Sequence, residues 1–583
     1  MNRYIKHALI IAMATPFLSS CLQEFMPTDE AIQEQVNKTD KTSLAKAIPA
    51  YLNTYDDDEY YDIGFAGFFL WRDASTADFP IVDPAYDYFT YVENCNYLGS
   101  NWALQYTIWR RYYALVQKTN LVLGAVDIDT YPEDADPAVQ AYAYRANAYM
   151  EMAQWYEYKL TGYAAFDDKA RADGILGLTV PIVDENTTEV ESRNNPRVPF
   201  YTLYRFVLGD LTNATELLQG TSEPVSKINA GRGVVNGLLA RFWLTVGTRF
   251  ELHPDDLATA LAHENDADIK YGKLGVTTAR ECFEKAATYA RAAINAGYTP
   301  LSEGQWFDPI TGFNSVNGAW LWANIISTDN GLASSMVWQS WVSFMSPEAE
   351  YGVAYPDYMA TRMINSRLFD EMPTSDWRKP TWIDPDDVAS QSAYNNKYAR
   401  GTSLPFETWK RLKAYSGIKF HPANGNYATS TVGNAVSIPL MRVEEMYLIE
   451  AEAVGRSQGE GAGRQLLEAF VNGYRYSDGS YKSNGAGLEG FVDDVFTQKR
   501  IEFWGEGLIL WDYRRLEKAV VRGYPGTNFD ASHRYNSLPN AVAPWSTLCI
   551  PQSEQDYNPA VILNPDPSHS TVYTLWTEEE SGI

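Results

Sequence analysis

Aromatic side chains are the residues of this sequence best suited to specific chemistry, and the chemistry they suit is non-covalent recognition of sugars. The 583-residue chain contains 40 Tyr, 17 Trp and 24 Phe, and the rings are most dense between Tyr51 and Tyr113. The apolar C–H face of a sugar packs against a ring while its hydroxyl groups find hydrogen bonds. Packing between helices is the more ordinary role of any single ring, so only the excess as a whole favours a binding surface.

Two aromatic segments and their polar neighbours supply the candidate ligand contacts. Truncating a stacking ring at the centre of an interface often costs about 2 kcal/mol or more of binding free energy. Charged and amide groups beside such rings could exchange hydrogen bonds with sugar hydroxyl groups. The candidate rings are Trp71, Tyr86, Tyr88 and Trp102 in the first segment and Trp338 and Trp341 in the second, and the candidate polar groups are Arg72, Asp73 and Asn101.

Paired carboxylates are the main enzymatic alternative, because glycosidases use two carboxyl groups about 5–9.5 Å apart. The acidic run of residues 56–59 is more simply interpreted as a solvated or calcium-compatible loop, and no cofactor is predicted. Nothing in the sequence singles out an acid with a raised pKa, so this alternative stays open. The candidate carboxylates are residues 56–59, Asp83 with Asp87, and Glu444 with Glu445.

Other catalytic motifs fit poorly. Residues 455–459 match G-x-S-x-G, but a nucleophile elbow needs a preceding strand, and here a predicted helix precedes, which makes Gly455 a plausible helix cap. The glycines of residues 231–237 have the wrong spacing for a dinucleotide loop, and His263-Glu264 lacks the second histidine of a zinc protease motif. The six histidines are scattered, so no metal triad is predicted.

Composition and charge exclude several partners. A net charge of −27 argues against nucleic acid, whose backbone requires neutralisation by Lys and Arg, and against direct docking on anionic lipid. The sequence is 45% hydrophobic, which is ample for a large core. Apart from Cys21, the cysteines Cys95, Cys282 and Cys549 are odd in number and widely spaced, so they predict no disulfide framework or metal cluster.

The N-terminus predicts a secretory signal over residues 1–20. A basic start is followed by an apolar run at residues 8–18, which is shorter than the roughly 20 residues that span a bilayer. Leu18-Ser19-Ser20-Cys21 resembles the bacterial lipobox, which implies cleavage before Cys21 and acylation of its thiol. Two or more acyl chains anchor stably, since each buried CH₂ contributes about 0.8 kcal/mol. In the alternative interpretation, an ordinary signal peptide, Cys21 is incidental.

Helical periodicity dominates the first half of the chain. Small residues at close-packing positions make the predicted helices resemble tetratricopeptide-like stacking, without the strict repeat signature. Residues 71–101 lack this periodicity and are predicted to form a long aromatic loop, a feature that is often functional. Helices are predicted at about residues 44–54, 102–125, 137–158, 199–218, 231–250 and 280–296, with an extended segment at residues 176–183.

The second half changes character. Residues 301–435 are rich in Trp, Gly, Asn and Pro and are predicted to form loops and short strands, whereas helices return at about residues 442–454, 463–472 and 490–504. We therefore predict a mainly α protein. Its predicted parts are a lipidated tether at residues 21–45 and a single domain at residues 46–583, divided into a helical-repeat-rich half at 46–300, a loop-rich region at 301–435, and C-terminal helices with an irregular tail at 436–583.

Several segments, in order, resemble the SusD/RagB family. Residues 109–120 fit the pattern W-x-x-x-Y-x-x-[IV]-x-x-x-N, and residues 142–158 are similar to the family's helix rich in alanine and tyrosine. The chain departs from the family at Ile509, where arginine is usual, and it has few acidic residues after Cys21, which bears on which side of the outer membrane it faces. Further similar segments are GLTVPIVD (177–184), IPLMRVEEMYLIEAEA (438–453), QKRIEFWGEGLILWDYRRL (498–516) and IPQSEQDYNPAVILN (550–564).

The resemblance implies a non-enzymatic lipoprotein on the outer membrane that faces the cell exterior. It implies capture of oligo- or polysaccharide and delivery to a SusC-like TonB-dependent transporter. A glycoside hydrolase with a carboxylate pair and a peptide- or glycoprotein-binding lid are the alternatives. The charged residues of the two C-terminal helices are predicted to form ion pairs that brace the fold: Arg442, Glu444, Glu450, Glu452, Arg500, Glu502, Glu506, Asp512, Arg514 and Arg515.

Overall fold

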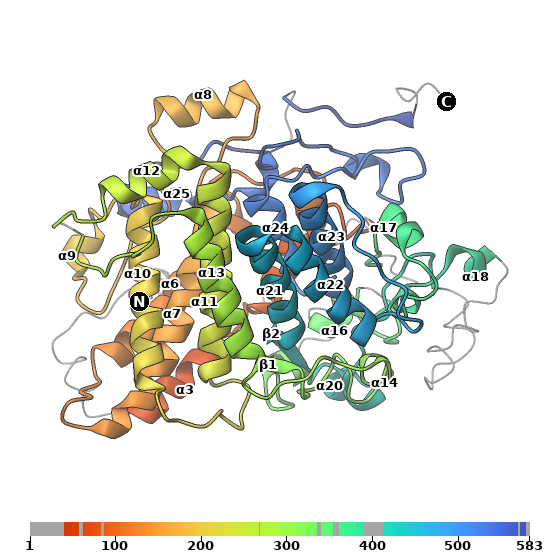
Figure 1. The fold of residues 1–583 in the computed structure, drawn as a ribbon, viewed down its shortest axis with the longest axis horizontal. Coiled ribbons are helices and arrows are strands. Elements are labelled where there is room, and N and C mark those ends of the chain that lie inside the picture. Colours follow the sequence, from red (N-terminus) through yellow and green to blue (C-terminus); the bar gives the residue numbers. More distant parts are fainter. Residues whose placement is uncertain are drawn as a thin grey trace, which may run out of the picture.

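Helices supply most of the regular structure, which confirms the mainly α prediction (Figure 1). The computed structural model describes residues 40–56, 62–82, 87–267, 269–334, 340–353, 361–389, 412–568 and 572–578. The helices of the N-terminal half lie on the left of Figure 1. The long ones are α3 (Lys41–Tyr51), α6 (Ala103–Leu123), α7 (Ala135–Tyr156), α10 (Phe200–Leu217), α11 (Arg232–Leu252) and α13 (Ala279–Ile294).

These helices stack on one another in chain order. α6 packs on α7, α7 on α10, α10 on α11 and α11 on α13. The stack continues through α21 (Val443–Gln458) and α22 (Glu460–Tyr474), since α13 packs on α21 and α21 on α22. This arrangement agrees with the predicted tetratricopeptide-like stacking of helix on helix.

The contact between α11 and α13 shows how the sequence specifies the stack. Phe283, Ala286 and Ala290 recur at steps of three and four residues on α13, and all three are buried. Gly247 of α11 lies against Phe283, where an added Cβ would come within 2.8 Å of the ring. A glycine opposite a large ring therefore lets the two helices approach closely.

Shorter elements complete the fold. The two strands of the described residues, β1 (Trp320–Ile325) and β2 (Ser437–Arg442), pair antiparallel with Asn324 opposite Ile438. A further long helix, α23 (Gly487–Glu502), packs on α21 and α22. The short helices are α4 (Ala66–Ala74), α5 (Thr90–Glu93), α8 (Ala164–Ala172), α9 (Glu189–Ser192), α12 (Pro254–Ala262), α14 (Glu303–Trp306), α15 (Gly331–Ser334), α16 (Trp341–Met345), α17 (Ser366–Glu371), α18 (Pro385–Ala389), α20 (Ser430–Gly433), α24 (Ile509–Arg515) and α25 (Gln552–Tyr557), with 3₁₀ turns η1 (Pro132–Asp134), η2 (Lys379–Thr381), η5 (Ala423–Gly425), η6 (Ala531–His533) and η7 (Pro544–Ser546).

The first helix begins earlier than predicted. α3 starts at Lys41 because the carboxylate of Asp40 caps it, accepting the backbone N–H of Thr42 at 3.2 Å and the hydroxyl of Ser43 at 3.0 Å. The predicted helix at residues 44–54 is therefore shifted along the chain, and the end of the predicted tether is helical.

The predicted loop at residues 71–101 is partly wrong. Its first residues belong to α4, and all nine residues of α4 are buried. Arg72 and Asp73 are buried charges at the end of this short helix, and charged residues are rarely buried, so the sequence favours a solvent-facing loop there. Residues 94–102 do form an irregular loop between α5 and α6.

Buried ion pairs brace the C-terminal helices, which confirms the predicted role of these charges. The Glu502 carboxylate of α23 accepts hydrogen bonds from Arg378, Arg442 and Arg475. Burial alone would raise its pKa, but Arg475 first and then Arg442 hold the pKa of Glu502 well below its ordinary value. On α21, Glu452 pairs with Arg515 in the same way.

Candidate functional site

Ring contacts link four aromatic side chains beside the start of α6. The ring centroids of Tyr88 and Tyr91 lie 5.4 Å apart, and those of Tyr91 and Tyr97 lie 4.6 Å apart. Tyr97 then contacts Trp102 at 4.3 Å. Tyr106 follows one turn beyond Trp102 on α6. We refer to Tyr88, Tyr91, Tyr97, Trp102 and Tyr106 as the aromatic array.

Three rings of the array are exposed to solvent, while Tyr88 and Tyr91 are partly buried against the core. Tyr97 is 41% exposed, Trp102 is 47% exposed and Tyr106 is 38% exposed. Asn101 is exposed next to Trp102, and the guanidinium of Arg110 lies 5.3 Å from the ring of Tyr106. Grouped exposed rings with polar neighbours mark interaction surfaces, whereas an isolated exposed ring carries little information.

The loop of residues 94–102 holds the array in a strained backbone. Cys95 and Tyr97 adopt φ values of 55° and 57°, a left-handed conformation that costs a non-glycine residue about 1–3 kcal/mol. The amide of Gln105 donates to the carbonyl of Leu98 at 2.8 Å, which ties the loop to α6. Backbone strain that the surrounding structure maintains is typical of functional loops.

The C-terminal tail fixes the same loop from outside. The backbone N–H of Leu98 donates to the hydroxyl of Ser568 at 2.9 Å, and the backbone N–H of Gln552 donates to the carbonyl of Ser100 at 2.9 Å. Trp102 is the N-cap residue of α6 and has extended backbone angles. The exposed indole of Trp102 therefore lies at the N-terminal end of α6.

Successive rings of the array are strongly inclined. The interplanar angles are 78° between Tyr88 and Tyr91, 61° between Tyr91 and Tyr97, and 69° between Tyr97 and Trp102. Such edge-to-face contacts stabilise the rings against one another. A ligand that stacks on more than one ring must follow this turn, since the rings do not form a flat platform.

The structure brings together three of the nine residues proposed as ligand contacts. Tyr88 and Trp102 belong to the array, and Asn101 is exposed beside it. Tyr86 and Trp338 lie outside the described residues.

The other four proposed contacts are enclosed in the core, which corrects their assignment. Trp71 is 2% exposed and packs on Phe89, and Trp341 packs on Phe69 and Phe420. The guanidinium of Arg72 donates to Glu151 at 2.5 Å and to Tyr112 at 2.7 Å. Asp73 accepts the backbone N–H of Gly507 at 3.1 Å, and burial raises the pKa of Asp73 to about 8. Burial leaves none of Trp71, Arg72, Asp73 and Trp341 open to a surface ligand.

Three members of the array were missed by the sequence analysis. Tyr91, Tyr97 and Tyr106 lie within the aromatic-rich segment but are not among the predicted ligand contacts. The signal that could have found them is the spacing of tyrosines among Asn94, Asn96 and Asn101, since amide-rich loops rarely build cores.

The carboxylates considered for a hydrolase are engaged with arginines. Glu445 binds Arg241 through both oxygens at 2.7 and 2.6 Å. Glu444 lies 2.9 Å from Arg442 in an ion pair, and Asp87 pairs with Arg362. Asp56 lies 3.6 Å from Arg110, whereas Asp83 and residues 57–59 lie outside the described residues.

The G-x-S-x-G match lies inside α21. The Ser457 hydroxyl donates to the carbonyl of Ala453 at 2.7 Å, and Gly455 lies against the ring of Phe491. The helix continues to Gln458, and the capping glycine is Gly459, with φ of 105°, so Gly455 is a packing position and not the predicted cap.

Among the described residues, no group of three or more His, Cys, Asp and Glu side chains is arranged to hold a metal ion. The part of the chain that the structure describes contains no helix of sufficient length and apolar character to cross a membrane. Cys95, Cys282 and Cys549 are free and buried, and burial raises the pKa of the Cys95 thiol to about 12.

Two family models match the sequence. The model described as "Starch-binding associating with outer membrane" matches residues 74–244, which include all members of the aromatic array. The model described as "SusD family" matches residues 354–566. A comparison with curated proteins found no match.

Solved structures with the same fold cover nearly the whole chain. A SusD-like carbohydrate binding protein from Bacteroides vulgatus is 19% identical with a TM-score of 0.62, and the alignment covers 92% of this chain and 98% of that chain. A laminarin binding SusD-like protein is 15% identical with a TM-score of 0.59 over 90% and 98% of the two chains. Surface glycan-binding protein A from Bacteroides thetaiotaomicron, in complex with laminarihexaose, is 17% identical with a TM-score of 0.57 over 92% and 99%.

Proposed function

The chain belongs to the SusD family, and on that premise we propose that it captures oligo- or polysaccharide on the aromatic array without cleaving it. The observation that carries the proposal is the chain of ring contacts from Tyr88 to Trp102, which ends in the exposed rings of Tyr97 and Trp102. Exposed rings bind the C–H faces of sugars, and Asn101 offers amide hydrogen bonds to their hydroxyl groups. Two proteins of the same fold, one described as laminarin binding and one in complex with laminarihexaose, support the ligand class.

The proposal extends to the place where capture occurs. A family model that describes association with the outer membrane supports a membrane-attached protein. We propose lipidation of Cys21 as the anchor, orientation toward the cell exterior, and delivery of glycan to a SusC-like TonB-dependent transporter. Co-purification of a TonB-dependent transporter from detergent-solubilised outer membranes is the expected result. Recovery of the protein without such a transporter would contradict the proposed partner. A Cys21→Ala variant that stays in the outer membrane would contradict the proposed anchor.

The binding proposal is tested by affinity electrophoresis of residues 22–583 in gels containing plant, host or microbial polysaccharides. Retardation by one glycan class, with no breakdown products in the gel, is the expected result. Cleavage of the polysaccharide would contradict capture without hydrolysis and would favour a glycoside hydrolase with a carboxylate pair. An absence of retardation by every glycan would overturn the proposal in favour of a peptide-binding or ligand-free lid.

Trp102→Ala locates the site. We expect this variant to lose at least about tenfold in glycan affinity, because truncating a central stacking ring removes a large share of binding energy. The melting temperature should stay within a few degrees, since the indole is half exposed and packs mainly on Tyr97. Tyr131→Ala is the matched control, because Tyr131 is 48% exposed in the connection between α6 and α7. Equal affinities of the two variants would place the site elsewhere.

A further inference from the structure

Helix α25 connects the aromatic array to a second surface feature. At its start, the backbone N–H of Gln552 donates to Ser100, two residues before Trp102. At its end, the amide of Asn558 donates to the carbonyl of Asn195 at 2.7 Å and accepts the backbone N–H of Asn195 at 3.0 Å. A helix of six residues spans about 9 Å. The loop that carries Trp102 and the loop that carries Asn195 are therefore separated by only the length of α25.

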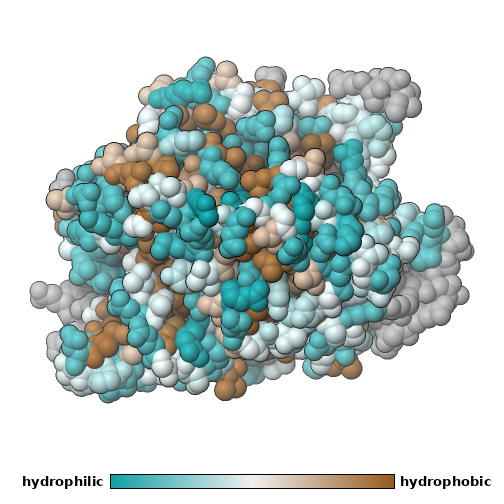
Figure 2. All heavy atoms as spheres, viewed as in Figure 1, coloured by the Kyte–Doolittle hydropathy of each residue, from teal (hydrophilic) through white to brown (hydrophobic). Residues whose placement is uncertain are grey.

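A hollow of about 600 Å³ opens beside Asn195. Its walls come from the segment between residues 182 and 202, which includes α9, and from residues 269–271. The surface around α9 is predominantly hydrophilic (Figure 2). The polar residues that line the hollow carry amides, hydroxyls, two carboxylates and an ammonium group: Asp184, Asn186, Thr187, Glu191, Asn194, Asn195, Thr202, Lys270 and Tyr271.

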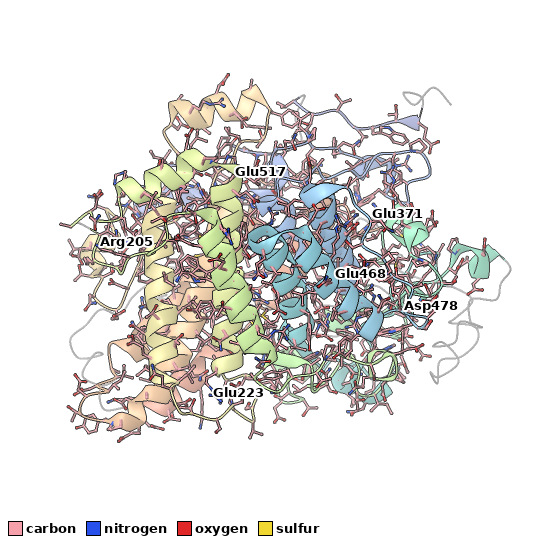
Figure 3. All side chains as sticks on the ribbon, in the orientation of Figure 1. Arg205, Glu223, Glu371, Glu468, Asp478 and Glu517 are labelled. Carbon is pink, nitrogen blue, oxygen red and sulfur yellow. The ribbon has the colours of Figure 1, made fainter. Side chains whose placement is uncertain are left out.

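One wall of the hollow is held by a buried arginine. Arg205 of α10 (labelled in Figure 3) donates to the carbonyls of Tyr271 at 2.7 Å, Gly272 at 2.5 Å and His263 at 3.1 Å. Because the guanidinium donates its hydrogen bonds to backbone carbonyls, it fixes the path of the chain between His263 and Gly272. Across the hollow, the amide of Asn195 donates to the carbonyl of Ile182 at 2.8 Å. Both walls are therefore shaped before any ligand binds.

The hollow is lined in part by polar side chains without protein partners in the described part of the chain, and an exposed ring lies near it. Among the described residues, the side chains of Asn194 and Thr202 have no hydrogen-bond partner. Tyr557, at the end of α25, is 43% exposed, and the guanidinium of Arg193 lies 5.4 Å from its ring. Trp102 and Tyr557 are thus exposed rings near opposite ends of one short helix.

We propose that a glycan chain bound at Trp102 continues across α25, stacks on Tyr557 and places further sugar units in the hollow beside Asn194 and Thr202. The inference rests on the proposed glycan-binding function and narrows its ligand to extended chains. Rings at both ends of α25 supply stacking surfaces, and amides with hydroxyls supply donors and acceptors for sugar hydroxyl groups. The hollow is a separate subsite, which a short oligosaccharide on the array does not reach.

The test uses a ladder of oligosaccharides made by partial acid hydrolysis of the polysaccharide that retards the protein most. Calorimetry would measure the Kd for each length, from the disaccharide upward, with residues 22–583. We expect affinity to rise once the chain is long enough to cross α25, by roughly tenfold as for an added stacking ring. Tyr557→Ala and the double variant Asn194→Ala/Thr202→Ala should lose this gain and keep the parent Kd for the shortest binding chains. Trp102→Ala should weaken every length.

The outcomes separate this inference from the function on which it rests. Affinity that depends on Trp102 but not on chain length would overturn the second subsite and leave the array intact. A length-dependent gain that survives in both hollow variants would also overturn it. Failure of every member of the ladder to bind would overturn the proposed function itself. Melting curves of the variants would show that the hollow substitutions act on binding and not on folding.

Discussion

Asp73 shows how a residue chosen as a ligand contact instead affects stability. It lies at the end of α4 with its carboxylate against the N–H of Gly507, and burial raises the pKa of Asp73 from 3.8 to about 8. Between these values the folded protein holds a proton on Asp73 that the unfolded chain has lost. The free energy of unfolding contributed by this group therefore falls as pH rises from about 4 to 8.

The variant Asp73→Asn removes this titration and keeps an oxygen that can accept from Gly507. We expect the free energy of unfolding of the variant, relative to that of the parent protein, to increase by more than about 1 kcal/mol as pH rises from 5 to 8. Urea unfolding of both proteins across this range measures the difference. A difference that does not change with pH would show that Asp73 is ionised throughout.

Trp71 and Trp102 show why single residues of the site could be predicted only in part. Both are tryptophans of one aromatic-rich segment, yet Trp71 is 2% exposed against Phe89 and Trp102 is 47% exposed against Tyr97. Composition predicted where rings gather and what they could bind. Which ring faces solvent depends on packing partners far away in the sequence, such as Phe344 behind Phe89.

At the scale of elements, the loop of residues 94–102 depends on contacts that do not touch a ligand. Gln105 is fully buried, and its amide holds the carbonyl of Leu98 between the strained Tyr97 and Trp102. Gln105→Met keeps the volume and removes this hydrogen bond. We expect glycan affinity to fall several-fold because the rings lose their fixed orientation. A loss of about 1–2 kcal/mol in the free energy of unfolding should accompany it.

Calorimetry with the retarding glycan and a melting curve measure the two effects of Gln105→Met. Thr212→Val is a suitable control. Thr212 is exposed on α10, more than 100 residues along the chain from Gln105, and its hydroxyl donates only to the carbonyl of Leu208 in the same helix. Unchanged affinity in the Gln105 variant would show that the neighbouring anchors at Ser568 and Gln552 are enough to hold the loop.

Elements with one exposed face were predictable, and buried or long-range ones were not. The stripe of Phe283, Ala286 and Ala290 predicted α13 within one residue at its start and two residues at its end. α4 could not be recognised because it is short and buries Arg72 and Asp73, which a sequence pattern assigns to solvent. The pairing of β1 with β2 joins Trp320 to Arg442, and no local pattern encodes such a distant contact.

At the scale of the whole molecule, the described residues share one large hydrophobic cluster from Ala45 to Tyr573, and buried arginines connect its parts. Arg378 follows α17, Arg442 ends β2 and Arg475 ends α22, and all three meet on Glu502 of α23. Segments far apart in sequence thus converge on a single carboxylate. Such a junction resists separation of the helical stack from the loop-rich region, since opening it would expose unpaired buried charges.

Glu502→Gln tests this junction. The substitution leaves three buried arginines short of one negative charge, and we expect it to lower the free energy of unfolding by about 3–5 kcal/mol. The arginines hold the pKa of Glu502 below its ordinary value of 4.5, so its contribution is complete above that value. It is lost progressively as pH falls further, because the unfolded chain then binds the proton first. Parent and variant should therefore differ most near neutral pH and converge under acid conditions. Urea unfolding between pH 3 and 7 measures this difference, and a gap that widened toward pH 3 would show that Glu502 is not the charge on which the junction depends.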